Sequence, residues 1–131
     1  MRILLDTHYV IWLTIDIGRL KPHELQFLAE GHEVLVSSVS LIEIRFKWRS
    51  LDAKGQPKGR MSASTALDLV RRNDFALMDL SAANIAAELQ PALAHSDPFD
   101  ELLLLHAQQL DAKLLTRDDE LRDHPAAYRL A

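Results

Sequence analysis

Short apolar runs separated by longer amphipathic stretches form the pattern of this chain. Each run is only a few residues long and is followed by polar residues, which predicts a buried strand. The predicted strands are residues 2–5, 33–37, 75–80 and 112–116, with a short last one at 128–130. Asp6 follows the first strand directly, and Asp118 comes soon after the fourth.

The stretches between these strands carry the start and stop signals of helices. Asp97 followed by Pro98, with an acid in the first turn, is the clearest start. Ser40 and Glu43 have the spacing of a capping box, which predicts that their helix begins at Ser40. The predicted helices span 7–15, 22–30, 40–49, 62 or 64 to 73, 81 to the proline at 91, and a segment from 98 onward, and residues 54–60 form the one clear loop.

Alternating strands and helices predict an α/β fold with a mainly parallel sheet covered by helices on both faces. In such sheets the functional residues lie beyond the carboxyl ends of the strands. The length of 131 residues fits a single domain, residues 1–131, without internal repeats.

Composition narrows the class of protein further. The chain is 48% hydrophobic and 26% charged, as in ordinary globular domains. It has no cysteine, so any metal must be held by oxygen or imidazole ligands. No apolar stretch approaches the ~20 residues that span a bilayer, and the N-terminal residues lack the pattern of a secretory signal. We therefore expect a cytoplasmic protein with no membrane partner.

Positive charge is concentrated in one segment. Residues 45–60 hold six basic residues against Asp52 alone, a net +5 in a chain of net charge −4, which leaves −9 for the remainder. Arg45, Arg49 and Lys54 are the candidates for guiding the phosphates of a nucleic acid. The alternative is an ordinary solvated helix face that runs into a loop.

Four acids are candidates for one metal-binding crevice. Asp6 and Asp118 follow strands, and Glu43 and Asp100 fall in first turns of predicted helices. Mg²⁺ and Mn²⁺ prefer such oxygen ligands, and converging carboxylates repel one another until a cation binds. The alternatives are local: Glu43 could be only half of its capping box, and Asp100 is favoured by the helix dipole anyway. Asp6 has no capping role unless a helix begins at once.

Other polar residues have simpler explanations. Thr7 and Thr116 lie beside strand ends and are candidates to orient an acid or a phosphate, although hydroxyls also serve as turn and cap groups. The histidines, including His8 and His95, show no paired spacing for zinc and are interpreted as local hydrogen-bonding residues.

Four fragments together resemble the PIN-domain family. They are Leu4-Leu-Asp6-Thr7-His8, Ser37-Ser-Val-Ser-Leu-Ile-Glu43-Ile, His95-Ser-Asp-Pro-Phe-Asp100-Glu-Leu-Leu and Leu114-Leu-Thr116-Arg-Asp118. In this order and at these intervals they closely resemble the VapC-type toxins of bacterial toxin–antitoxin pairs. The resemblance implies a three-layer α/β/α fold around a mainly parallel sheet of four to five strands.

The resemblance also implies an activity and its residues. It implies a Mg²⁺- or Mn²⁺-dependent endoribonuclease that leaves a 5′-phosphate, forms a homodimer and is silenced by a cognate antitoxin. The family's four acidic positions fall on Asp6, Glu43, Asp100 and Asp118, and its threonine falls on Thr116. Asp118 is chosen over Asp119 because it fits the threonine-x-acid pattern.

From these positions we expect Asp6 and Asp100 to ligate the ion directly, Glu43 to position or deprotonate the attacking water, and Asp118 to complete the outer shell. Trp12 and Trp48 are candidate anchors for an antitoxin segment.

Two other classes remain open. One is a catalytically inactive PIN-like module that binds RNA or protein. The other is a phosphoryl-transfer protein with Asp6 as nucleophile, which would lack a second acid two residues later, where His8 stands.

Overall fold

Parallel strands form the central sheet of the computed structural model, which describes residues 1–95 and 97–130. Within those residues the sheet has five strands in the order β3-β2-β1-β4-β5, and every pair is parallel. The predicted parallel α/β architecture is confirmed. The strands are β1 (Arg2–Leu5), β2 (Glu33–Ser37), β3 (Ala76–Met78), β4 (Lys113–Leu115) and β5 (Ala127–Tyr128).

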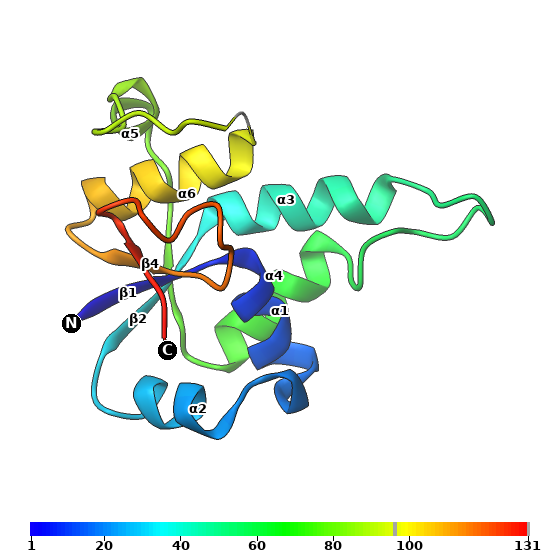
Figure 1. Cartoon of the computed structure of the whole chain (residues 1–131). Helices are drawn as coiled ribbons and strands as arrows, with labels where there is room; N and C mark the ends of the chain where they lie inside the picture. Colours follow the sequence, from blue (N-terminus) through cyan, green and yellow to red (C-terminus); the bar gives the residue numbers. More distant parts are fainter. Residues whose placement is uncertain (96, 131) are drawn as a thin grey trace.

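Helices cover both faces of this sheet (Figure 1). Helices α1, α2 and α4 lie on one side and α5 and α6 on the other, while α3 leads outward to a long protruding arm (Figure 1). In the described residues no helix is both long and apolar enough to cross a membrane. The bounds are α1 (Thr7–Ile15), the 3₁₀ turn η1 (Ile17–Arg19), α2 (Pro22–Leu28), α3 (Ser38–Arg49), α4 (Ala63–Arg72), α5 (Ala82–Ala86) and α6 (Pro98–Gln109).

Alternating side chains of β1 divide the core into two layers. Leu4 packs with residues of α6 such as Leu103 on one face. Ile3 and Leu5 pack on the other face, where Tyr9 belongs to α1. All of these side chains are buried. A strand that is apolar on both faces fits only between two helical layers, which explains the continuous apolar run at residues 3–5.

The register of the sheet brings distant strand ends together. Leu5 pairs with Leu115 across β1 and β4, and the backbone N–H of Asp6 donates to the Leu115 carbonyl at 3.0 Å. The residues that follow these strands, Asp6 and Thr116, are therefore neighbours at the carboxyl edge of the sheet. This is where the functional residues of a parallel sheet are expected.

The loop predicted for residues 54–60 lies within a narrow hairpin-like extension, residues 50–60, here called the arm. Leu51 and Pro57 form an antiparallel bridge, and the Lys58 N–H donates to the Ser50 carbonyl at 2.8 Å. At its root the Gly59 N–H donates to the Lys47 carbonyl at 3.0 Å. A Cβ at Gly59 would lie 2.8 Å from the Trp48 backbone nitrogen, so only glycine fits this approach.

Two predicted helices differ from those observed. Helix α3 begins at Ser38 with Ser37 as its N-cap, so the predicted capping box of Ser40 and Glu43 is wrong. Ser40 is instead buried, where its hydroxyl accepts from Thr7 at 3.0 Å. Helix α5 ends at Ala86, well before Pro91. The chain leaves the helix early and buries Leu89 against the α6 side of the core.

Candidate active site

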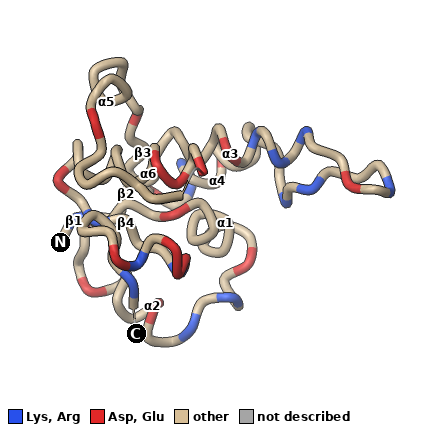
Figure 2. Tube along the Cα trace, turned by 45° about the horizontal axis from the view of Figure 1, so that its top comes forward, with Lys and Arg blue, Asp and Glu red and all other residues tan. Residues whose placement is uncertain are grey.

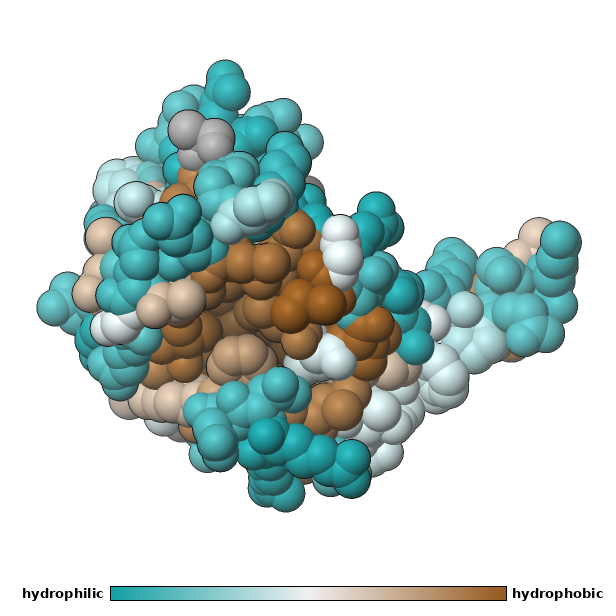
Figure 3. Space-filling view, turned by 90° about the horizontal axis from the view of Figure 1, so that it is seen from below, coloured by the Kyte–Doolittle hydropathy of each residue, from teal (hydrophilic) through white to brown (hydrophobic). Residues whose placement is uncertain are grey.

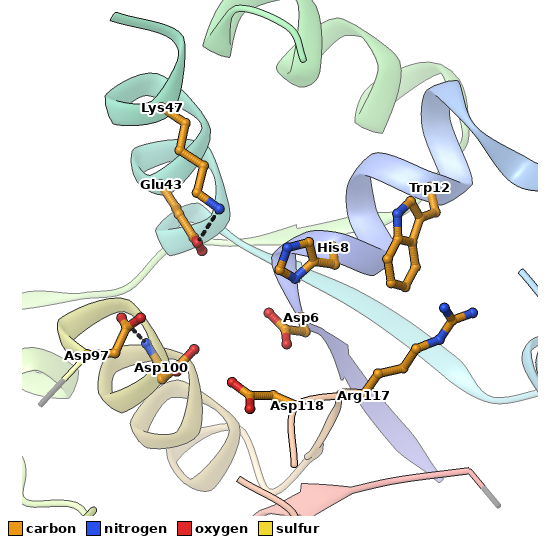
Figure 4. Close-up of a pocket in the computed structure, with 9 residues that line it drawn as sticks. All are labelled: Asp6, His8, Trp12, Glu43, Lys47, Asp97, Asp100, Arg117 and Asp118. Atoms are coloured by element: carbon orange, nitrogen blue, oxygen red, sulfur yellow. Dashed lines mark hydrogen bonds and ion pairs between the residues drawn. The ribbon is translucent and has the colours of Figure 1, made fainter. Parts of the chain in front are cut away.

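The four predicted acids line one pocket of about 370 Å³ at the carboxyl edge of the sheet. Figure 4 shows their carboxylates approaching the same space from β1, α3, α6 and the segment after β4. We call this the acidic pocket. Its lining residues are Asp6, His8, Trp12, Glu43, Lys47, Asp97, Asp100, Arg117 and Asp118.

Asp6 has two local partners that fix its carboxylate. It is the N-cap of α1, which begins at once after β1, and its Oδ1 accepts from the Thr7 N–H at 2.7 Å. Its Oδ2 accepts from the Thr116 hydroxyl at 2.6 Å. Because the helix begins at once, Asp6 has a capping role, and it also lines the pocket. Burial raises its pKa, as does the negative charge of Glu43, although the Thr116 hydrogen bond and His8 oppose this.

Thr116 also holds the fourth acid in place. Its hydroxyl oxygen accepts from the Asp118 N–H at 3.0 Å, so a single hydroxyl links the positions of Asp6 and Asp118. Asp119, in contrast, is exposed and forms ion pairs with Arg122 and Arg129 outside the pocket. The geometry therefore favours Asp118 as the fourth acid.

Glu43 lies in the second turn of α3, not in the first turn as predicted, because the helix begins at Ser38. Its carboxylate is 3.2 Å from the Lys47 ammonium one turn later (Figure 4). This i,i+4 pair places a cation at the rim of the acidic pocket. Glu43 is thereby held toward the other acids without a direct bond to them.

Asp100 lies in the first turn of α6, as predicted, with Asp97 as the N-cap that accepts from the backbone N–H of Asp100 at 3.2 Å. Burial, together with the charges of Asp97, Asp6 and Asp118, raises the pKa of Asp100 to about 7. The His95 imidazole, 3.8 Å away, acts in the opposite direction. The negative charges around the Asp100 carboxylate are therefore not balanced by the nearby positive charge.

The donor set of the acidic pocket fits a hard divalent cation. Carboxylate oxygens are the preferred ligands of Mg²⁺ and Mn²⁺, and a cation would relieve the repulsion that raises the pKa of Asp100. Across residues 1–95 and 97–130, no three Asp, Glu or His side chains are already gathered as a complete ligand group. Magnesium retains several waters and needs only one or two direct carboxylates, so this looser arrangement is compatible with it.

Glu24, a carboxylate that does not line the acidic pocket, is bound by Arg117 of the segment that follows β4. Glu24 of α2 is buried and accepts from Arg117 Nε at 2.9 Å, from a second Arg117 nitrogen and from the Tyr9 hydroxyl. Burial acts against ionisation of Glu24, but the hydrogen bonds from Arg117 and Tyr9 lower its pKa to about 2. We call Glu24, Tyr9 and Arg117 the compensated cluster.

The predicted basic residues and Thr7 lie outside the acidic pocket. Residues 45 and 49 are about 200° and 240° around α3 from Glu43 at 100° per residue, and Arg45 and Arg49 line a separate small pocket with Trp48. Lys54 is exposed on the arm, whose Lys and Arg residues stand out in Figure 2. Thr7 is buried and bonds to Ser40, so it ties α1 to α3 rather than facing the pocket.

Four pocket residues were missed as candidates for chemistry: His8, Trp12, Lys47 and Arg117. Three of them had a local signal. His8 and Trp12 are four residues apart on α1, and Lys47 is four residues after Glu43, so each pair shares a helix face. Arg117 stands between Thr116 and Asp118, but nothing local indicates its partner Glu24, which is 93 positions away.

Comparisons with known proteins identify the family and the fold. A family model described as PIN domain matches residues 3–127. No match was found among curated proteins. Among solved structures, the chain is similar to one in VapBC2 from Rickettsia felis bound to a DNA fragment from their promoter, with 20% identity and a TM-score of 0.68, covering 99% of this chain and 98% of that chain.

Two further complexes contain chains of similar fold. DNA-bound VapBC from Salmonella typhimurium gives 17% identity and a TM-score of 0.61, over 99% of this chain and 97% of that chain. A toxin–antitoxin complex from Klebsiella pneumoniae gives 18% identity and a TM-score of 0.58, over 97% and 98%. At these identities the likeness concerns the fold.

Proposed function

Since the chain belongs to the PIN domain family, we propose that it is a metal-dependent endoribonuclease and the toxin of a toxin–antitoxin pair. The family as a whole supports a nuclease. The observation that carries the proposal is the gathering of Asp6, Glu43, Asp100 and Asp118 around one pocket. The raised pKa of Asp100 adds the electrostatic reason for a bound cation.

In this proposal Asp6 and Asp100 hold the ion, Mg²⁺ or Mn²⁺, at the centre of the acidic pocket. When bound, the ion would supply charge stabilisation at the scissile phosphate and would acidify the attacking water. Asp118 completes the outer shell, where a carboxylate acts through water molecules. Thr116 keeps Asp6 and Asp118 in register through its shared hydroxyl.

Glu43 is the proposed group that positions the attacking water or takes its proton. It enters the pocket from α3, apart from the strand ends that carry Asp6 and Asp118. Lys47, 3.2 Å away, keeps its carboxylate oriented toward the pocket and remains available to a phosphate oxygen.

RNA is the proposed substrate. The positively charged residues Arg45, Arg49 and Lys54 remain candidates to attract its phosphates from a distance. Arg45 and Arg49 line a pocket separate from the acidic one. Their proposed role is therefore to attract the approaching RNA, not to contact the scissile bond.

A cognate antitoxin and a second copy of the chain are the proposed protein partners. Large apolar side chains are exposed on α3, with Ile42 at 43%, Phe46 at 41% and Trp48 at 40%. On the side of α1 and α2, apolar residues also gather in a hollow with a hydrophilic rim (Figure 3). Such patches are typical of protein interfaces. Of the two proposed anchors, Trp48 is exposed and Trp12 is half-buried.

The nuclease proposal is tested with single-stranded RNA and the variants Asp6→Asn and Asp118→Asn. Loss of the Asp6 carboxylate should lower cleavage in Mg²⁺ or Mn²⁺ by about three orders of magnitude, about 4 kcal/mol. Loss of the outer-shell Asp118 carboxylate should lower it by about 10–100-fold, while Asp119→Asn should cleave as the wild type does. Calorimetric titration with Mn²⁺ should give binding to the wild type and weaker binding to Asp6→Asn. Near wild-type cleavage by both variants would refute the assignment, and RNA binding without any cleavage would favour the inactive module.

The partner proposal has its own test. Co-expression with the neighbouring open reading frame should yield a stable complex, and replacement of Trp48 by Ala should weaken it. A monomer that captures no such partner would contradict the proposal.

A further inference from the structure

A second pocket of about 370 Å³ adjoins the acidic pocket and differs from it in charge. The two pockets share His8, Trp12 and Lys47 as a common wall. Beyond this wall the second pocket is bounded by Arg19, Lys58 and Arg60. We call it the basic groove. It is continuous with the proposed site of cleavage, but no acidic side chain is among the described residues that line it.

The basic groove has an apolar base and an aromatic side. Ile11, Ile44 and Met61 lie beneath it and are buried, at 8%, 3% and 5% exposure. The exposed His8 ring stacks on Trp12 with 5.6 Å between centroids and 29° between planes. Rings such as these are the surfaces on which proteins stack unpaired bases.

Cations surround the groove in excess over carboxylates. Arg19 and Arg60 share one acid, Asp16, at 3.4 and 3.1 Å. Lys58 adds a further charge from the arm, and Lys47 connects the groove to the acidic pocket. A phosphate in the groove would therefore meet net positive charge, whereas the acidic pocket alone would repel it.

The root of the arm fixes two of these cations. Lys58 and Arg60 flank Gly59, which lies so close to the backbone of α3 that a Cβ would collide with it. The Gly59 and Lys58 N–H groups bond to the carbonyls of Lys47 and Ser50. The groove is thus part of the folded body, although the tip of the arm protrudes (Figure 1).

We propose that the basic groove binds one nucleotide of single-stranded RNA next to the scissile phosphate. The base stacks on the His8–Trp12 pair over the apolar floor, and Lys58 and Arg60 bind the flanking phosphate. This inference rests on the proposed nuclease function, since it supplies that site with a substrate path. It gives the arm a defined role: its root holds the cations that bind the phosphate.

The charge part of the proposal is tested with Lys58→Glu combined with Arg60→Glu. For cleavage of a six-nucleotide single-stranded RNA, KM should rise about 10-fold or more with kcat little changed. The slope of log binding constant against log salt should become shallower by about 0.7, because the two cations no longer neutralise the one flanking phosphate. The matched control is Arg71→Glu with Arg72→Glu, the same charge change at exposed positions of α4. An unchanged KM in the groove variant, or an equal rise in the control, would overturn the proposal.

The stacking part is tested at His8. Replacement by Ala should raise KM about 10-fold, in the range found when a base loses its stacking partner. Replacement by Phe keeps a ring and should restore KM to within about threefold. If His8→Phe behaved like His8→Ala, the imidazole would act through its nitrogens and stacking would be excluded.

A binding measurement separates failure of this inference from failure of the nuclease proposal. Trp48→Phe leaves Trp12 as the single tryptophan, because the chain has two. Titration of this variant with the same RNA in EDTA should quench Trp12 fluorescence, and Lys58→Glu with Arg60→Glu should abolish the quenching. Quenching without cleavage by any form of the protein would leave the groove standing and refute the nuclease. If the double variant instead quenched as before but no longer captured the antitoxin, the groove would be a protein-docking surface and the proposal would be overturned.

Discussion

The compensated cluster and the acidic pocket meet at the segment that follows β4, and consecutive residues of that segment take part in them. Arg117 turns toward Glu24 in the compensated cluster, and Asp118 lines the acidic pocket. Glu24 and Asp100 are both largely shielded, with side chains 3% and 15% exposed. Their pKa values nevertheless shift in opposite directions, to about 2 and about 7.

The difference lies in what surrounds each carboxylate. Glu24 accepts hydrogen bonds from Arg117, Tyr9 and the Lys21 N–H, so its charge is balanced by the fold itself. Asp100 faces the charges of Asp97, Asp6 and Asp118. Glu24 therefore has its counter-charge and hydrogen-bond donors within the folded chain. The acids of the pocket lack a counter-charge of this kind, which a bound cation would supply.

The two clusters should respond oppositely to pH. Glu24 has a lowered pKa, so its contribution to stability is present above 4.5, the value for an unperturbed carboxyl, and is lost as pH falls toward 2. Asp100 has a raised pKa, so the folded state is favoured at low pH and loses stability as pH rises from 3.8 through about 7.

Breaking the compensated cluster should have the largest effect. Glu24→Gln leaves Arg117 without its buried counter-charge, and we expect the free energy of unfolding to fall by about 3–5 kcal/mol. Urea denaturation at pH 7 measures it. The control Glu30→Gln removes an exposed carboxylate at the end of the same region and should change little. If Glu24→Gln were as stable as the wild type, the attraction between Glu24 and Arg117 would not exceed the cost of removing both charges from water.

Removing the Thr116 hydroxyl that positions two of the pocket acids should have the next largest effect. Thr116→Val keeps the side-chain shape but removes the hydroxyl shared by Asp6 and Asp118. Loss of such a supporting group costs about 10–100-fold in activity or metal affinity, which kcat/KM for RNA would report. Thr14→Val, which removes a hydroxyl bonded only to helix carbonyls, is the control. Full activity in Thr116→Val would mean that the acids hold their positions without it.

Removing one charge from the acidic pocket should stabilise the metal-free protein. Asp100→Asn relieves repulsion, and we expect unfolding at pH 8 in EDTA to require about 1–2 kcal/mol more than in the wild type, a value discounted for solvent screening. The gain should be smaller at pH 5, where the wild-type Asp100 is protonated. Asp68→Asn, at an exposed position of α4, tests for a general charge effect. A gain independent of pH would contradict the raised pKa.

Stabilisation by a divalent cation should be the smallest of these effects, because the cation balances only the charges of the acidic pocket. At a Mg²⁺ concentration about ten times its dissociation constant, the wild type should gain about 1.4 kcal/mol of stability. Asp100→Asn should gain less, and Glu24→Gln should gain as much as the wild type. Thermal unfolding with Mg²⁺ or EDTA measures this. If Mg²⁺ stabilised the wild type and Asp100→Asn equally, the ion would not bind at Asp100.

Local patterns predicted the parts of the fold that depend on neighbouring residues. The Asp97-Pro98 start of α6 and the position of Asp6 after β1 are of this kind. The start of α3 was misplaced because Ser37 caps the helix, while Ser40 bonds to Thr7, 33 positions away. The early end of α5 also depends on a distant contact, since the Gln108 side chain bonds the backbone of Gln90 at 3.1 Å.

The functional residues also fall into those that local sequence predicts and those that depend on distant contacts. The acids of the acidic pocket were predictable from strand ends and from the family resemblance, because each motif is short. The compensated cluster was not, since Glu24 and Arg117 meet only through the packing of α2 against the end of β4. The basic groove was missed for the same reason: charge along residues 45–60 indicated a basic segment, but only the geometry separates Lys58 and Arg60 from Arg45 and Arg49.

The strand order has a consequence for the timing of biosynthesis. Strand β1 is made first, yet it lies between β2 and β4, and Asp6 meets Thr116 and Asp118 only after β4 has emerged from the ribosome. A nascent chain therefore carries Asp6 and Glu43 long before it has a complete pocket. A fragment that stops at residue 110 should be inert toward RNA, and adding back the peptide 111–131 is the direct way to ask whether completion of the sheet restores cleavage.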